Sequence, residues 1–182
     1  MDGTLLGLIF LAILGAAIGL SNQATEKQQR ESSNLYDLGF ELMFLLLSAR
    51  KGINTLFALA EQEQKENDYI TEKINEVIDE LFKGVSESYN KINPITTQQE
   101  NLYKGLKELT EKIKNNQKIE DSDHSIQLLD DYLEKNITSS DFAKLYSTNI
   151  EKVRKRINQK IGENYKVETY SSNDSLFKIT KL

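Results

Sequence analysis

The chain of 182 residues has no cysteine, no tryptophan, one proline and one histidine. Without cysteine it has no disulfide framework of the kind that stabilises small secreted domains. Because proline interrupts helices, a single proline leaves room for long helices over most of the sequence. Charged residues make up 28% of the composition, which also favours long helices over a strand-rich fold.

An excess of positive charge is also missing. The formal net charge is -5 at pH 7. Proteins that bind nucleic acids generally carry a surplus of lysine and arginine, because they contact phosphate groups. We therefore expect no nucleic-acid partner.

The residues and motifs of familiar enzyme chemistry are scarce. There is no cysteine nucleophile, and no GxSxG motif that would present a serine to the only histidine, His124. A P-loop and a GxGxxG motif are absent as well. Acidic residues at the start of a helix explain the one cluster that resembles metal ligands, which consists of Glu120, Asp121, Asp123 and His124. We predict a non-enzymatic protein without a cofactor or metal.

One long stretch, residues 3–20, carries no charge. As a helix with a rise of about 1.5 Å per residue, it approaches the ~30 Å hydrocarbon thickness of a bilayer. We interpret residues 1–20 as a transmembrane anchor, so that the predicted localisation is single-pass in a membrane and the lipid bilayer is a partner. A cleavable signal peptide is an alternative, although Asp2 stands where such signals carry positive charge. The other alternative is that this stretch forms a buried helix in the core of a soluble domain.

Glycines recur within this stretch at multiples of four residues, so they fall on one helix face. Small residues let helices approach closely in lipid, as in GxxxG pairs. The candidates for helix packing are Gly3, Gly7, Gly15 and Gly19. Lys27 and Arg30 follow the stretch and favour a cytoplasmic location for the C-terminal domain.

Residues 21–33 are polar and form either a stalk or a continuation of the first helix. From Asn34 to about residue 60, apolar residues recur in steps of three and four, as in a heptad seam. A second apolar face makes this helix wider than a two-stranded coiled coil requires, so we expect the helix to lie centrally in a bundle. The predicted interaction face consists of Leu35, Leu38, Leu42, Leu45, Phe40 and Phe44.

Four further amphipathic segments follow, and residues 34–162 are predicted to form an antiparallel helical bundle. After Gly162 the apolar residues alternate with a period of two, with a turn signal at Asn173 and Asp174. Residues 163–182 are therefore expected to form a β-hairpin, with a disordered tail as the alternative. The predicted fold class is mainly α, with an N-terminal transmembrane helix, a bundle and a C-terminal hairpin.

The second half of the last predicted helix is rich in positive charge. Cations near a helix C-terminus are favoured by the helix dipole and need no partner. In a domain beside a membrane, they would also contact anionic lipid headgroups. The candidates for lipid contact are Lys152, Lys155, Arg156 and Lys160.

Residues 45–54, LLLSARKGIN, resemble the first ligand-domain helix of bacterial chemoreceptors, in which an anchor leads into a helix with Leu-Leu-x-x-Arg and then Asn. The order of helices up to Ile161 is also similar to the four-helix sensor bundle of that family. The resemblance implies that Arg50 contacts a ligand. The chain departs from the family because it has no second membrane span and no signalling domain.

Our leading hypothesis is a membrane-anchored, non-enzymatic structural or assembly subunit. Its helical bundle would bind partner proteins of a membrane complex, or further copies of itself as a homo-oligomer. The first alternative is a ligand sensor or binding module with its site near Arg50. The second is a pore-forming or holin-like protein, in which the glycine-faced helices associate.

Overall fold

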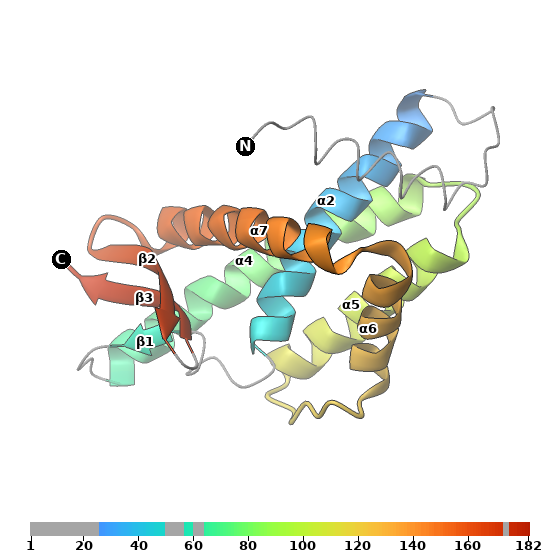
Figure 1. Cartoon of the computed structure of the whole chain (residues 1–182). Coiled ribbons are helices and arrows are strands. Elements are labelled where there is room, and N and C mark those ends of the chain that lie inside the picture. Colours follow the sequence, from blue (N-terminus) through green and yellow to red (C-terminus); the bar gives the residue numbers. More distant parts are fainter. Residues whose placement is uncertain (1–25, 50–56, 60–63, 173–174) are drawn as a thin grey trace.

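The computed structural model describes residues 26–49, 57–59, 64–172 and 175–182. Helices dominate these ranges, and three short strands form one small sheet at an end of the molecule (Figure 1). This confirms the predicted mainly helical class and the C-terminal hairpin. The elements are α2 (Glu26–Ala49), β1 (Phe57–Leu59), α4 (Gln64–Lys91), α5 (Thr97–Lys114), α6 (His124–Asn136), α7 (Ser139–Ile161), β2 (Tyr165–Ser172) and β3 (Ser175–Lys181).

No helix within the described ranges is both long enough and apolar enough to cross a lipid bilayer. This finding contradicts the predicted localisation as a single-pass membrane protein, and we correct it accordingly. The described helices are amphipathic, with their apolar faces packed on one another and their charged faces in solvent. The anchor prediction was based on residues 1–20, which lie outside the described residues.

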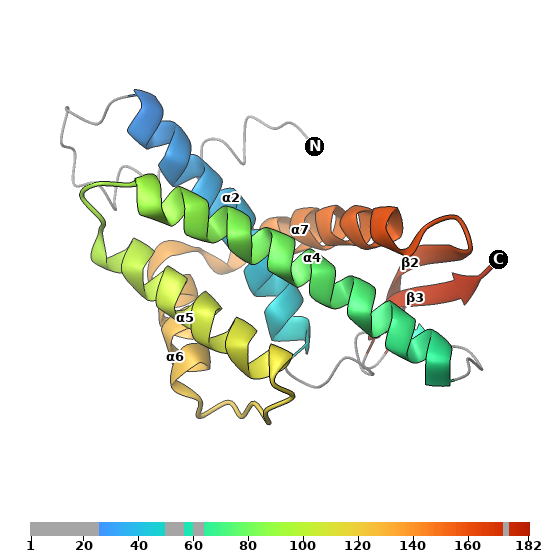
Figure 2. The same cartoon turned by 180° about the vertical axis from the view of Figure 1, so that it is seen from behind.

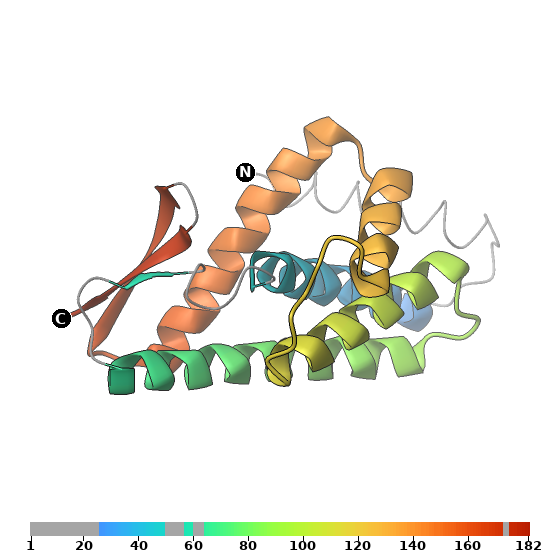
Figure 3. The ribbon, with the colours of Figure 1, turned by 90° about the horizontal axis from the view of Figure 1, so that it is seen from below.

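Helix α4, with 28 residues, runs along one side of the molecule from the sheet to the end formed by α5 and α6. Figure 2 shows it across the front of the molecule. Helix α7 lies close to α4 near the sheet and diverges from it toward α6, so that the two helices form a wedge (Figure 3). Helix α2 crosses the space inside this wedge, where it packs against α4, α5 and α7.

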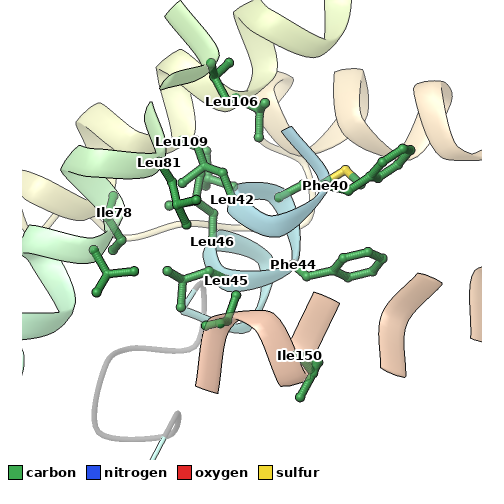
Figure 4. Close-up of a cluster of buried hydrophobic side chains, with 14 of the residues drawn as sticks. Phe40, Leu42, Phe44, Leu45, Leu46, Ile78, Leu81, Leu106, Leu109 and Ile150 are labelled. Atoms are coloured by element: carbon green, nitrogen blue, oxygen red, sulfur yellow. The ribbon is translucent and has the colours of Figure 1, made fainter. Parts of the chain in front are cut away.

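Helix α2 occupies the centre because its second half is apolar around most of its circumference. Residues 41–46 are all buried. Leu42 and Leu46 point toward α4 and α5, whereas Phe40 and Phe44 point in the opposite direction (Figure 4). A helix with apolar side chains on opposite faces must be enclosed by other elements to keep those side chains out of water.

The sheet has the strand order β1–β3–β2, in which β3 pairs antiparallel with β2 and parallel with β1. Val167, Phe177 and Ile179 are buried, while Lys166 and Glu168 are exposed, as expected for strands with one face on the core. Strand β1 corrects the prediction that the first heptad seam continues as a helix to residue 60. Periodicity does not distinguish a strand from a helix in a short apolar run. Here the pairing with β3 stabilises the run as a strand.

Helix α2 includes residues 26–33, so the helix does not start at Asn34 and this described part of the polar segment is helical. Contacts with other helices explain the earlier start. The Glu31 carboxylate lies 3.8 Å from the Lys91 ammonium of α4. The buried Ser32 hydroxyl accepts a hydrogen bond from the Gln99 amide of α5 at 3.4 Å.

Candidate functional site

Five of the predicted site residues lie outside the described residues. Four of them are the helix-packing glycines Gly3, Gly7, Gly15 and Gly19. The fifth is Arg50, for which the chemoreceptor resemblance implied a ligand contact. The roles assigned to these residues stay predictions.

The predicted interaction face of α2 lies inside the protein's own core. Leu35, Leu42, Leu45, Phe40 and Phe44 are at most 1% exposed. Leu38 is half-buried and faces Gly84 of α4. The structure therefore corrects the prediction that these side chains face a partner. Because apolar residues cover more than one face of α2, this helix contacts α4, α5 and α7 at once.

Two of the predicted lipid-contact cations connect α7 to α2. Arg156 Nε donates to Glu41 Oε2 at 2.6 Å, and the Glu41 side chain is only 6% exposed. Lys152 Nζ lies 3.8 Å from Glu41 Oε1 and 3.7 Å from Asp37 Oδ1. A carboxylate at this depth requires a cationic partner, because burial without one is costly. These cations thus have a structural role in joining the two helices.

A third cation of the set, Lys160, joins α7 to α4. Its ammonium group forms an ion pair with Glu80 and lies 3.8 Å from Glu76. The hydrogen bond with Glu80 raises the pKa of Lys160 above its ordinary value. The fourth cation, Lys155, is exposed. Intramolecular ion pairs therefore account for three of the four charges, and the lipid contact itself stays a prediction.

Asp123, from the cluster that resembled metal ligands, holds the connection between α5 and α6. Its carboxylate forms an ion pair with Lys112 of α5 and accepts a hydrogen bond from the Glu120 N–H at 2.9 Å. The bond from Lys112 is the main reason why the pKa of Asp123 lies below its ordinary value. The neighbouring His124 is exposed as the first residue of α6.

A row of aromatic rings leads from the interior to the surface. Tyr36 stacks on Tyr132 with ring centroids 6.2 Å apart, and Phe40 lies 6.1 Å from Tyr132 and 6.4 Å from Phe44. Burial raises the pKa of the Tyr36 hydroxyl to about 12 and also raises the pKa of Tyr132. Both phenols are therefore neutral at physiological pH, and the inner end of the row carries no charge.

The outer end of the row reaches solvent at the start of α7. The ring of Phe142 is 5.6 Å from Phe44 and 6.2 Å from Tyr146, and Tyr146 meets Phe44 edge-on at 5.4 Å. Phe142 is 37% exposed. We call Phe44, Phe142 and Tyr146 the α7 aromatic cluster. Apolar spacing in the sequence places Phe142 in the stripe of the last predicted helix and gives no role to Tyr146. The polar residues just before Phe142 are the only sign in the sequence that this ring lies near the surface.

A second aromatic group packs between α4 and α5. Tyr103 lies between Tyr89 and Phe82, with centroid distances of 4.0 and 6.1 Å and nearly parallel rings. All three side chains are half-buried. Because the rings lie against one another, they bury their faces within the stack, and this group fits a structural role in joining the two helices.

A shallow hollow lies beside the C-terminal end of α7. Most of its lining residues are polar and exposed, so water solvates their charges and dipoles and each interaction with a ligand there would be weak. The lining residues are Asn158, Gln159, Gly162, Glu163, Tyr165, Lys166 and Leu182. Among the surfaces of the described residues, the α7 aromatic cluster is the better candidate for function.

Comparisons with family models, with curated proteins and with solved structures give no significant match to this chain.

Proposed function

We propose that this chain is a non-enzymatic interaction subunit that binds another protein through the α7 aromatic cluster. The observation that carries the proposal is the position of Phe142, which is 37% exposed and rests on two further rings. An isolated exposed ring on a protein surface needs no explanation, whereas an exposed ring supported by other aromatic rings has the anatomy of a binding hot spot.

Preorganisation supports this proposal. Phe44 is buried in the core, and its ring packs against Phe142 and Tyr146 from the side of the core. Rings that are already fixed lose little conformational freedom when a partner binds, so that more of the contact energy contributes to affinity. The exposed Lys144 and the polar residues before Phe142 supply the polar rim that surrounds such surfaces. The expected partner surface is therefore apolar at its centre and polar around it.

Site-specific photo-crosslinking tests the proposal in cells that naturally make the protein. The photoreactive residue p-benzoylphenylalanine replaces Phe142 in the full chain. Ser147, an exposed residue of the same helix, is replaced in a matched control. We expect a discrete adduct from position 142 and none from position 147, because only position 142 belongs to the cluster.

Mass spectrometry then identifies the adduct: a different protein supports the proposal, whereas a second copy of this chain overturns it in favour of self-association. Excess unlabelled wild-type chain should reduce the adduct, whereas a Phe142→Asp chain with unchanged circular dichroism should not. The proposal is overturned if both positions give the same adducts, or if position 142 gives none.

A further inference from the structure

Strand β2 forms one edge of the sheet, and the directions of its backbone groups follow from the register. The Leu182 N–H donates to the Asn164 C=O at 2.8 Å, one residue beyond the pairing of Tyr165 with Lys181. In antiparallel ladders, hydrogen-bonded and non-hydrogen-bonded pairs alternate. Lys166 and Glu168 therefore direct their backbone groups toward β3. Tyr165, Val167 and Thr169 direct theirs to the outer edge.

Side chains of α7 cover this outer edge. Arg154 Nη1 donates to the Val167 C=O at 3.3 Å. The Thr169 hydroxyl donates to the carboxylate of Glu151, which also accepts from Arg154 Nε at 3.0 Å. These two hydrogen bonds lower the pKa of Glu151, with the bond from Thr169 as the larger cause. Glu151 and Arg154 thus occupy positions that a neighbouring strand would need.

We propose that the outer edge of β2 is a strand-pairing surface for a second copy of this chain, which Glu151 and Arg154 keep closed. Edge strands present backbone donors and acceptors to any other strand, and proteins commonly shield them with charged side chains. This inference concerns a different surface from the α7 aromatic cluster, and it does not depend on the proposed function.

The sequence of β2 determines how two copies would pair. Because Val167 directs its backbone groups outward, two antiparallel β2 strands would pair with one Val167 opposite the other. Lys166 of each copy then lies opposite Glu168 of the other on the solvent face, where both side chains are exposed. Opposite charges directly across two strands stabilise the pairing. The strand is therefore complementary in charge to a second copy of itself.

Opening the edge tests the proposal in the full chain. Arg154→Met removes the donor to Val167 and retains an unbranched side chain, and Lys155→Met is the matched control on the adjacent exposed residue. We expect the association constant of the Arg154→Met chain, measured by sedimentation velocity, to exceed that of the control by at least about tenfold. The Val167 amide should exchange hydrogen more slowly as the protein concentration rises.

Charge reversal identifies the surface that pairs. In the Arg154→Met background, Lys166→Glu alone and Glu168→Lys alone should each abolish the association, because each places like charges opposite one another. An equimolar mixture of these two variants should associate again, since every pair across the strands is then of opposite charge.

The proposal is overturned if the Arg154→Met chain, with unchanged circular dichroism, associates no more than the control. It is also overturned if its association is insensitive to charge at positions 166 and 168. Arg154→Gln, whose shorter side chain does not reach Val167, is the second variant if the methionine chain does not fold.

Discussion

At the scale of single residues, close packing is clearest at two glycines in helices. A Cβ atom at Gly105 of α5 would lie 2.9 Å from Leu129 Cδ2, 3.0 Å from Leu129 Cγ and 3.2 Å from the Ser125 carbonyl oxygen. A Cβ atom at Gly84 of α4 would lie only 2.7 Å from Leu38 Cδ1, but the next atom, Leu38 Cγ, is 3.8 Å away. Gly105 therefore faces a branch point and backbone, whereas Gly84 faces the end of a side chain.

Gly105→Ala should destabilise the protein more than Gly84→Ala. Overpacking against Leu129 and Ser125 costs about 1–3 kcal/mol, which exceeds the gain of up to about 1 kcal/mol from replacing a helical glycine with alanine. At Gly84 the half-buried Leu38 can rotate away, so that the two effects nearly cancel. Urea unfolding followed by circular dichroism measures both free energies. A loss at Gly84 that equals or exceeds the loss at Gly105 would show that the shortest distance decides the cost, and not the mobility of the contacting atom.

The sequence predicted the identity of the buried residues far better than their role. Phe40 and Phe44 were predicted on a buried face of a central helix and were also assigned to an interaction face, because apolar spacing shows that a face is buried and does not show which element covers it. The same limit applies to the cations of α7. Lys152 and Arg156 belong to a cluster of positive charge that is evident in the sequence. Their partner Glu41 is not evident, because it lies 115 residues away from Arg156.

At the scale of elements, charged side chains determine how neighbouring helices join. Helix α5 begins with a capping box in which Thr96 and Gln99 bond reciprocally. Helix α6 begins at His124, and Asp123 before it is held by Lys112 of α5. The amphipathic segments predicted before Gly162 are helices, because apolar spacing is a local signal. The sequence did not predict β1, whose pairing depends on a strand 120 residues later, at Phe57 opposite Phe177.

Asp123→Asn should reduce stability at neutral pH and have no effect in strong acid. The folded state lowers the pKa of Asp123, so the ionised carboxylate stabilises the fold above its ordinary pKa. This contribution disappears as the pH falls through the lowered pKa, because the carboxyl group is then protonated in both states. Urea midpoints of wild type and variant, measured from neutral to acidic pH, should converge.

Asp130→Asn provides the control for this pH profile, since Asp130 is an exposed acidic residue of α6, the helix that follows Asp123. Its midpoint should differ little from that of the wild type at any pH. A constant offset for Asp123→Asn across the whole pH range would instead indicate that the substitution acts through packing.

At the scale of the whole molecule, the sheet and the helices share one core. Val167, Phe177 and Ile179 belong to the same buried cluster as Leu42 of α2. An isolated hairpin is marginal in water, so the sequence predicts that the hairpin either docks on the bundle or pairs with a sheet edge from another chain. The structure places its apolar face within the core itself, and the third strand, β1, completes the sheet.

Ile179→Ala should therefore destabilise the entire chain and not only the hairpin. The residue is fully buried, and truncation of a buried isoleucine typically costs about 2–5 kcal/mol. Unfolding followed by helical circular dichroism and by hydrogen exchange of α5 amides should shift by the same free energy. Thr180→Ala, at the exposed neighbouring position, should leave both unchanged. A loss confined to the strands would show that the hairpin unfolds on its own.

The central position of α2 has a consequence for biosynthesis. This helix leaves the ribosome before every other described element, yet Arg156, which neutralises its Glu41, is translated 115 residues later. At roughly 5–20 residues per second, α4 and α5 become available to cover part of α2 several seconds before α7 covers the rest and supplies the partner of Glu41. Newly made protein should therefore depend on chaperones until α7 has been synthesised.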